Sequence, residues 1–589
     1  MKHTARRAVI ASLVSVVLAA LLYWFWLPPI HPRCPDFWTF ILACLVIVLV
    51  VFSLAGLTGA KRKGAGKKED TVVDFGGTKV HLPSMPNLPG MKKWAKGLLW
   101  CGGGIVALMI LASVIGATLF NAGRYKDLIV RTEGSFTEDI PKQMNRIPVV
   151  DRASATQLGK RTLGQMADLV SQFEIAPDYT QINFGGGPVR VTPLVYADLF
   201  KWFANQKNGI PGYIQVDMVS QEAELVRLEQ GIRYSPSEYL LRDLERHIRF
   251  QFPTKIFDSS SFEIDDEGMP YWITPTMTYR IGIWSGLDVE GAILTNAVTG
   301  ESRYYKVEDV PTWVDVLYRA DLILEQLGYN GRFQSGFWNS YFGQKGVLRT
   351  TDGYNYIAEG DDVYLYTGVT SVGGDESNVG FLLSNQRTKE TKYYPCAGAT
   401  EYSAMDSAEG QVQNLRYTAT FPLLLNVAEQ PTYFMALKDA SELVKMYAMV
   451  NVNQYQIVAT GATVAECESN YRQMLRQSNL ISDDQTGIDQ PVETDRRSLE
   501  GVIAEIRSAV VDGNSIYFLR FTGETDFTVR MSAADVPYAP LLNVGDRVRV
   551  WYYDGHVSEF WIEACDLELL PVSTPAEPDD AQPSGGVDA

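Results

Sequence analysis

The sequence predicts an α+β protein with three N-terminal transmembrane helices, a body of repeated antiparallel-sheet-plus-helix units, and a separate C-terminal β-module. Three observations predict this: three long apolar runs lie within the first 120 residues, two similar stretches of strand pattern begin 89 positions apart, and strand patterns resume after a polar linker near residue 490. At 589 residues the chain is too long for one core, and 46% apolar and 21% charged residues are typical of folded proteins.

The three apolar runs cover residues 8–27, 37–57 and 98–120. Each has about 20 residues without a charge, which at 1.5 Å per residue crosses a hydrocarbon core of roughly 30 Å. Aromatic residues lie at their ends, as is typical of membrane interfaces: Tyr23, Trp24, Trp26, Phe37, Trp38 and Trp100. We therefore expect residues 1–121 to form a membrane domain. A cleaved signal peptide at the first run is the alternative, but bulky aromatic residues occupy its end.

Charge predicts the orientation of these helices. Residues 1–121 carry a net charge of +9, and the rest of the chain carries −26. Lysines and arginines precede the first run and cluster in the loop 58–97, so the positive-inside rule places both in the cytoplasm. Everything after residue 121 is then extracytoplasmic. An acidic body also disfavours nucleic acid as a partner, because phosphate contacts require Lys and Arg.

Four small residues at positions 101–104 lie inside the third run. Small residues allow close helix approach, within one chain or between copies, so a homo-oligomer through the membrane helices stays open. Ordinary glycine use in a membrane helix is the simpler explanation.

The body divides into an α/β region at 122–250 and a duplicated β-meander and helix region at 251–480. In the second region, "GAILTNAVTGESRYYKVEDVP" starts at Gly291 and "GFLLSNQRTKETKYYPCAGAT" starts at Gly380. Each has an apolar strand, a polar turn and a strand with paired tyrosines, and a looser third copy spans 431–461. A single meander has one apolar face that needs a neighbour, so packing duplicated units together buries both faces.

Capping patterns predict where helices begin. Ser235 with Glu238 and Thr463 with Glu466 both match the S/T-x-x-E capping box. We also expect a helix from 151 to 173, and another that starts after Pro311 and ends at Gly328.

A linker at 481–497 precedes the C-terminal module, residues 498–570, and the tail 571–589 is rich in Pro, Asp and Gly and is expected to be disordered. The module has five strand patterns with an interruption after the third, which resembles an OB-like β-barrel. Residues 500–568 hold 12 acids and 5 arginines, so we expect a structural or protein-binding barrel.

No catalytic set or cofactor site is evident in the sequence. The body has only two histidines, His247 and His556, in different modules, and no G-x-S-x-G nucleophile motif occurs. Four cysteines outside the apolar runs are far apart, show no zinc spacing, and leave disulfide pairing open: Cys34, Cys396, Cys467 and Cys565.

Two groups of residues are candidate binding sites. Asp265, Asp266 and Glu267 form an acidic turn that is a weak Ca²⁺ candidate, with a solvated hairpin as the alternative. The paired tyrosines of the two copies could present an aromatic surface to a peptide or glycan, with core packing as the alternative: Tyr304, Tyr305, Tyr393 and Tyr394.

Four phrases of the body, "GIPGYIQVD", "FEIDDEGMPYWI", "TGESRYYKVEDVPTWVD" and "GFWNS", resemble a family of uncharacterised membrane-anchored proteins of Gram-positive bacteria. The strand, T-G-E turn and strand unit is also similar to PepSY domains, although Asn296 stands where their D-x-x-T-G-x pattern has Asp. The resemblance to PepSY domains implies extracytoplasmic regulation of peptidases or signalling, and it carries over no catalytic residue.

Together these observations predict a membrane-anchored scaffold or sensor of the cell envelope that binds another protein or a wall component. They favour a binding protein over an enzyme. Two alternatives stay open. One is an envelope hydrolase, a peptidase or a glycosidase with an Asp/Glu pair. The other is an accessory subunit of a transport or secretion complex.

Overall fold

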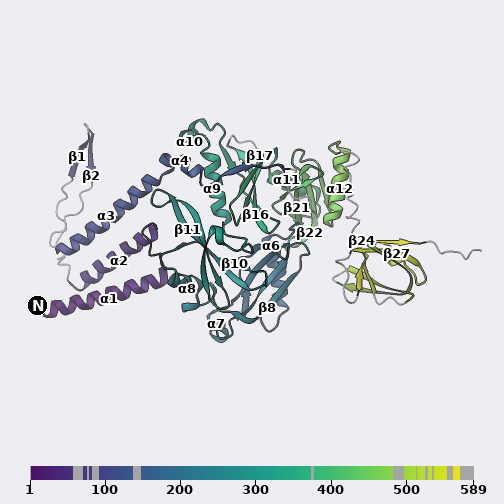
Figure 1. Cartoon of the computed structure of the whole chain (residues 1–589), viewed down its shortest axis with the longest axis horizontal. Helices are drawn as coiled ribbons and strands as arrows, with labels where there is room; N and C mark the ends of the chain where they lie inside the picture. Colours follow the sequence, from purple (N-terminus) through teal and green to yellow (C-terminus); the bar gives the residue numbers. More distant parts are fainter. Residues whose placement is uncertain are drawn as a thin grey trace, which may run out of the picture. The chain divides into compact units, whose positions relative to one another are not determined.

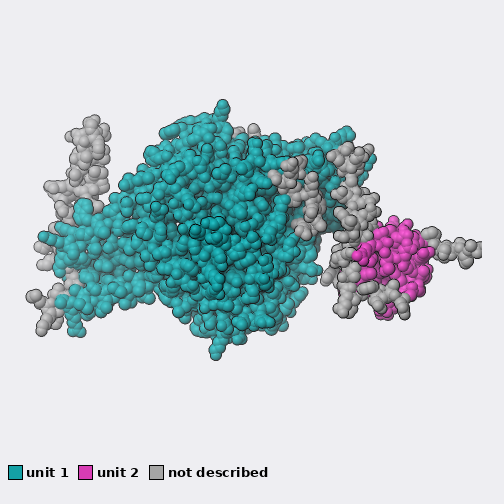
Figure 2. Space-filling view, viewed as in Figure 1, with its two compact units in different colours: residues 1–481 teal, residues 482–589 magenta. Residues whose placement is uncertain are grey.

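The computed structural model forms two compact units, residues 1–481 and 482–589 (Figure 2). It describes residues 2–56, 71–75, 78–82, 92–136, 147–372, 377–481, 496–511, 514–523, 528–533, 536, 538–553, 561–564 and 566–570. The predicted linker 481–497, apart from its ends, and the whole predicted tail lie outside the described residues.

Three helices at the N-terminus are long and apolar enough to cross a membrane: α1 (Lys2–Trp26), α2 (Pro35–Leu54) and α3 (Lys93–Gly116). They match the three predicted runs to within a few residues at most ends. A short helix, α4 (Thr118–Lys126), follows α3. Within the loop between α2 and α3, strands β1 (Thr71–Phe75) and β2 (Thr78–Leu82) pair antiparallel.

The body of unit 1 contains four sheets with the same connectivity. In each, one long strand pairs with two short preceding strands on one side and begins a three-strand antiparallel meander on the other. We name them repeats 1 to 4. The long strands are β6 (Gly187–Tyr196), β11 (Pro270–Ile281), β16 (Asp362–Ser371) and β21 (Gln430–Lys438).

The remaining strands of repeat 1 are β4 (Phe173–Ile175), β5 (Thr180–Phe184), β7 (Ile210–Asp217) and β8 (Ala223–Ile232). Repeat 2 has β9 (Ile256–Phe257), β10 (Ser261–Ile264), β12 (Ser285–Asn296) and β13 (Ser302–Lys306). Repeat 3 has β14 (Leu348–Thr350), β15 (Asn355–Glu359), β17 (Ser377–Asn385) and β18 (Thr391–Ala399), with β3 (Arg131–Glu133) added parallel to β18. Repeat 4 has β19 (Thr418–Ala419), β20 (Leu423–Val427), β22 (Val444–Asn451) and β23 (Val458–Gly461). Figure 1 labels strands of each sheet, among them β8, β11, β16 and β21.

A helix follows each sheet: α8 (Leu244–Gln251), α9 (Ala320–Arg332), α11 (Glu401–Gln411) and α12 (Val464–Gln477). Helix α6 (Arg152–Gly164) precedes repeat 1, and α7 (Leu199–Asn205) lies between β6 and β7. Short helical turns are η2 (Leu240–Arg242), η3 (Val307–Asp309), α10 (Gly336–Trp338) and η4 (Asn339–Gly343). The repeat that we predicted as a duplication with a looser third copy therefore has four copies, and the first lies in the region 122–250.

One turn recurs at the end of the middle meander strand in all four copies. Its first residue is Asp217, Asn296, Asn385 or Asn451, and its side-chain Oδ1 accepts hydrogen bonds of 2.7–3.0 Å from the backbone N–H groups two and three positions later. This Asx turn needs only a short side chain with one acceptor oxygen. Asn296 therefore forms the same turn hydrogen bonds that an Asp would form at this position.

The residue after each Asx-turn residue links its copy to another segment of the same chain by backbone hydrogen bonds. Its N–H donates to a carbonyl near the start of the same copy's long strand, and its own carbonyl accepts from a segment outside the meander. In repeat 3, for example, Gln386 N–H donates to Val363 O at 2.9 Å, and Gln386 O accepts from Leu317 and Tyr318. The four copies thus share their connections as well as their strands.

Three helix predictions were wrong in whole or in part. The helix expected from 151 to 173 ends at Gly164, and Phe173 starts strand β4. The Ser235–Glu238 pattern does not start a helix: α8 begins at Leu244, and Asp243 caps it through its bond from Arg246 N–H at 3.0 Å. Glu238 is instead buried, where it accepts from Tyr196 Oη and Trp202 Nε1. The helix expected after Pro311 begins only at Ala320. By contrast, Thr463 caps α12 as predicted, with a 3.1 Å bond from Glu466 N–H.

Unit 2 has one six-stranded sheet around its own apolar core. Its strands are β24 (Arg496–Val511), β25 (Asn514–Phe521), β26 (Thr528–Ser532), β27 (Arg547–Tyr553), β28 (Trp561–Glu563) and β29 (Asp566–Leu569), with η6 (Ala539–Leu541) between β26 and β27. The order is β28-β26-β25-β24-β27-β29, and β26 and β28 pair in parallel. The structure confirms a β-sheet module here, and its classification as an OB-like barrel stays a prediction.

Candidate functional site

The acidic turn that we singled out for Ca²⁺ connects β10 to β11. Asp265 Oδ1 accepts from Glu267 N–H at 3.2 Å and from Met269 N–H at 2.8 Å, so this oxygen stabilises the hairpin. Asp266 and Glu267 are exposed beside it. Within the part of the chain that the structure describes, no group of three or more His, Cys, Asp or Glu could hold a metal ion.

The paired tyrosines occupy matching positions on β13 and β18, where Tyr304 pairs with Ile293 and Tyr393 with Leu382. None is fully exposed: Tyr394 is buried in the core, and Tyr304, Tyr305 and Tyr393 are half-buried. Tyr393 Oη donates to Val379 O at 3.1 Å. The rings thus pack at least in part within their sheets, and the binding surface stays a prediction.

The structure also places the histidines and cysteines considered in the sequence analysis. His247 lies in α8 with its ring centroid 4.3 Å from that of Tyr234, and its Nε2 is 2.8 Å from Gly300 O. Among the described cysteines, Cys34, Cys396 and Cys467 are free thiols. His556 and Cys565 lie outside the described residues.

Two cavities of about 630 and 650 Å³ lie where the four repeats meet. Both are lined by Arg152, Tyr179, Tyr354 and Tyr356, so we treat them as one space and name it the inter-repeat cleft. Repeat 1, the start of α6, repeat 3 around β15 and repeat 4 around β21 line the first cavity. Repeat 2 joins the lining of the second cavity through residues 259–262.

Arg190, in the middle of β6, lines the first cavity and is only 6% exposed. Its Nε donates to Val150 O and its Nη2 to Gln181 Oε1, both at the long distance of 3.3 Å. Among the described residues no carboxylate forms an ion pair with it. Burial lowers the pKa of Arg190 to about 10, against a smaller opposing effect of Tyr356 and Asp151, so the guanidinium is still charged at neutral pH.

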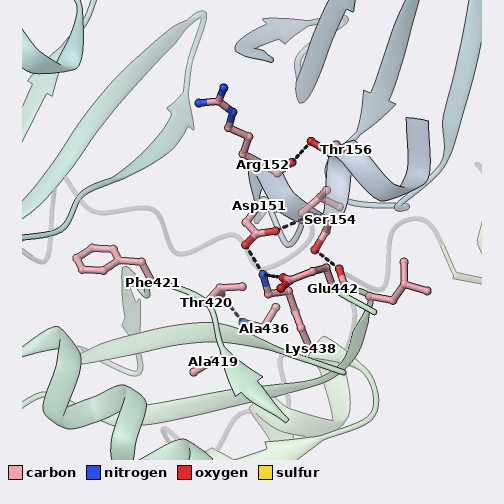
Figure 3. Close-up of polar contacts among 12 residues, drawn as sticks. Asp151, Arg152, Ser154, Thr156, Ala419, Thr420, Phe421, Ala436, Lys438 and Glu442 are labelled. Carbon is pink, nitrogen blue, oxygen red and sulfur yellow. Dashed lines mark hydrogen bonds and ion pairs between the residues drawn. The ribbon is translucent and has the colours of Figure 1, made fainter. Parts of the chain in front are cut away.

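A second cation and several aromatic rings lie around Arg190. Arg152, at the start of α6, forms an ion pair of 2.6 Å with Asp178, and its side chain is 58% exposed. Tyr354 is 43% exposed, and its ring centroid lies 5.6 Å from that of Tyr356. Phe421 contributes another ring to the lining, and Figure 3 shows the side chains of Arg152 and Phe421 extending away from the polar cluster beside them.

That polar cluster fixes one wall of the cleft (Figure 3). Asp151 caps α6 through a 2.8 Å bond from Ser154 N–H and also accepts from Lys438 Nζ at 2.7 Å. Lys438, on β21, pairs with Glu442 at 2.6 Å, and Ser154 Oγ donates to Glu442 O at 2.8 Å. Burial opposes ionisation of Asp151, but the hydrogen bond from Lys438 and its charge outweigh it and lower the pKa of Asp151. The cluster joins repeat 4 to the helix that begins repeat 1.

Two buried carboxyls lie behind Ser261 and Val316, which line the second cavity. Glu263 is fully buried and accepts from Asp315 N–H at 2.9 Å, Val316 N–H at 3.2 Å and Ser261 Oγ at 3.0 Å. Asp315 Oδ2 accepts from Asn183 N–H at 2.7 Å, and Asp315 Oδ1 has no partner within the described structure. Burial raises the pKa of Glu263 to about 7, and burial and then repulsion from Glu263 raise that of Asp315.

The cleft is suited to binding an anionic group. Arg190 supplies a charge that is already desolvated, and Arg152 and the aromatic rings supply further contact. Neither cavity has a histidine or cysteine among its described lining residues. The sequence analysis missed Arg190, although one signal was present: it is the only charged residue in the strand pattern "PVRVTPLVY", where every neighbour is apolar or small.

No family model matches the chain, and no curated protein matches it. Among solved structures, a prolyl endopeptidase, from a study of two such enzymes, has 8% identity over 80% of this chain and 65% of its own, with a TM-score of 0.15. The WD40 domain of SCAP from fission yeast has 7% identity over 61% of this chain and 72% of its own, with a TM-score of 0.12. Similarities this low carry no argument about fold or function.

Proposed function

We propose that the protein is a membrane-anchored scaffold or sensor of a Gram-positive cell envelope. Its body lies outside the cytoplasmic membrane and binds another envelope protein or a wall component through an acidic group. The observation that carries the proposal is the inter-repeat cleft, where Arg190 is buried beside neutral partners only, among the residues described. Since a buried cation without a counter-charge is costly, an anion that enters the cleft gains a strong partner.

Two finer proposals concern the architecture. The meander-plus-helix repeats are PepSY-like, which the recurrent Asx turn after the middle strand supports. Unit 2 is an OB-like barrel, which its pairing supports: β28 pairs with β26, β29 pairs with β27, and β28 and β29 follow each other with only residues 564–565 between them. One strand with a break would then contact both ends of the sheet.

Site-directed photo-crosslinking in intact cells tests the binding role. A crosslinking amino acid replaces Tyr354 at the cleft, and in a matched control it replaces Tyr455, which is 46% exposed in the turn between β22 and β23. We expect a product of defined mass at position 354 but not at 455, and we expect Arg190→Met to reduce it at least tenfold. Equal products at both positions, or a product that Arg190→Met does not change, would contradict the proposal.

The proposed location has a separate test. A reporter that is active only in the cytosol, fused after Ala589, should stay inactive in cells, while one that is active only outside should work. The opposite result refutes an extracytoplasmic body without bearing on whether the cleft binds an anion.

A further inference from the structure

A short exposed aromatic segment lies between α9 and repeat 3. Residues 336–343, which we name the aromatic segment, form α10 and the π-helical turn η4. Trp338 is 64% exposed, Tyr341 52% and Phe342 80%. Three large rings this exposed within eight residues need a partner, because soluble surfaces rarely gather such side chains.

The aromatic segment is attached to the end of the third membrane helix. Tyr125 of α4 donates from its Oη to Gly116 O, the last residue of α3, at 2.8 Å, and its ring lies 4.7 Å from Tyr329 of α9. From Tyr329 a row of ring contacts of 4.8–6.3 Å continues through Phe333 and Phe337 to Tyr341. Helices α10 and α4 are in contact, and they lie side by side in Figure 1. The exposed rings are therefore a continuation of the apolar contacts at the membrane helix end.

The ends of the other two membrane helices also contact the body. The Arg246 guanidinium of α8 lies 4.6 Å from the ring centroid of Trp24, near the end of α1. In the loop between α1 and α2, Ile30 N–H donates to Pro253 O at 2.7 Å, and Pro32 O accepts from Trp284 Nε1 at 3.3 Å. Contacts at both α1 and α3 fix the orientation of the body relative to these helices, so the aromatic segment stays beside the end of α3.

The charge around the aromatic segment differs from that of the body. Residues 328–350 contain Arg332, Lys345 and Arg349 and no Asp or Glu, whereas the chain after residue 121 carries −26. The Arg332 guanidinium lies 4.6 Å from the ring centroid of Tyr341. Aromatic rings combined with Lys and Arg are the composition that lipid headgroup regions select, particularly beside anionic lipids.

We propose that the aromatic segment inserts its exposed rings into the headgroup region of the bilayer leaflet at which α3 ends. It is a fourth membrane contact, made from within the body, and it lies in the interface without crossing the bilayer. The occupant of this apolar surface is the lipid, because the surface is continuous with the end of a membrane helix. This inference depends on the membrane anchoring in the proposed function, but not on which ligand the cleft binds.

Spin-label accessibility measures the depth directly. The full chain, with its reactive native cysteines replaced by serine, is reconstituted in nanodiscs of phosphatidylcholine and phosphatidylglycerol. A nitroxide is attached at Phe342→Cys, and separately at Leu111→Cys in α3 and Tyr402→Cys in α11, which are 55% and 48% exposed. Collision with O₂, which concentrates in lipid, is compared with collision with a water-soluble nickel chelate.

We expect the ratio of O₂ to nickel accessibility at position 342 to lie between those at 111 and 402, and at least threefold above that at 402, because the headgroup region lies between the hydrocarbon and water. A ratio at 342 equal to that at 402, with 111 in lipid, overturns the inference and leaves the membrane anchoring intact. Low accessibility to both reagents at 342 also overturns it, because a protein would then cover the segment. A water-like ratio at 111 overturns the anchoring itself. Trp338→Cys provides a second position if the Phe342 variant fails to fold.

Discussion

The folded protein should lose stability as the pH rises, because the buried Glu263 carboxyl must ionise. Replacing Glu263 by glutamine should remove most of this loss. The side chain is fully buried, and its partners are backbone N–H groups and one hydroxyl. Burial raises its pKa from 4.5 to about 7. Since a folded-state pKa above the unfolded value means that the folded protein binds the proton more tightly, the stabilisation is complete below pH 4.5 and is lost as the pH rises towards 7.

The size of the effect follows from the pKa difference. A pKa difference of one unit corresponds to about 1.4 kcal/mol. The rise in the pKa of Glu263 from 4.5 to about 7 therefore lowers the free energy of unfolding at pH 8 by about 3 kcal/mol. Glutamine does not titrate, so the variant should lack this loss. Its amide has a single acceptor oxygen in place of two, which costs about 1–2 kcal/mol at every pH because one backbone N–H loses its partner. The variant should therefore be less stable than wild type at low pH and as stable or more stable at pH 8.

The assay is thermal unfolding of the full chain in detergent, followed by tryptophan fluorescence, from pH 4.5 to 8. For a body of this size, about 3 kcal/mol corresponds to roughly 3–6 °C in Tm. Glu267→Gln, an exposed carboxyl in the same hairpin, is the control and should keep the wild-type profile. The reasoning is refuted if Glu263→Gln shows the same change of Tm with pH as wild type.

Two matched pairs of substitutions test packing and charge in the wall of the cleft. Gly159→Ala in α6 would place a methyl group 2.3 Å from Tyr179 Oη and should lower the free energy of unfolding by about 1–3 kcal/mol, whereas Gly164→Ala in the same helix meets nothing within 4 Å and should raise it by up to about 1 kcal/mol. Denaturant titration measures both, and failure of Tyr179→Phe to rescue Gly159→Ala would show that the hydroxyl is not the obstacle. Lys438→Met leaves Asp151 partly buried without its cation and should cost about 2 kcal/mol, between the values for surface and buried pairs. Lys445→Met, which breaks the more exposed pair with Asp439, should cost less than about 0.5 kcal/mol, and equal losses for the two lysines would contradict the assignment.

Local patterns predicted the parts of the fold that depend on local chemistry. The apolar runs identified α1 to α3, because an uninterrupted run of this length has few alternatives. The strand, turn and paired-tyrosine pattern identified repeats 2 and 3, and a looser strand and turn pattern identified repeat 4. Repeat 1 was not recognised in the sequence, because its turn begins with Asp217 and its strands lack the tyrosine pair. The same Oδ1 hydrogen bonds nevertheless form in its turn.

The failures arose where distant partners decide the local structure. Ser235 and Glu238 have the spacing of a capping box, but the carboxylate of Glu238 accepts hydrogen bonds from Tyr196 and Trp202 instead. The segment 312–319 has a helical pattern, but two of its backbone N–H groups bond to Glu263 instead. Arg190 and the other residues of the cleft come from four repeats, so no spacing in the sequence could have brought them together.

The ion pair between Asp151 and Lys438 joins residues 287 positions apart. During synthesis, α6 and the first sheet emerge long before the strand that supplies Lys438. Until then, the wall of the cleft that the Asp151–Lys438 pair fixes is incomplete. A chain made from its N-terminus thus passes through a stage in which its first sheet lacks this long-range partner and is more open to proteases and to association with other nascent chains.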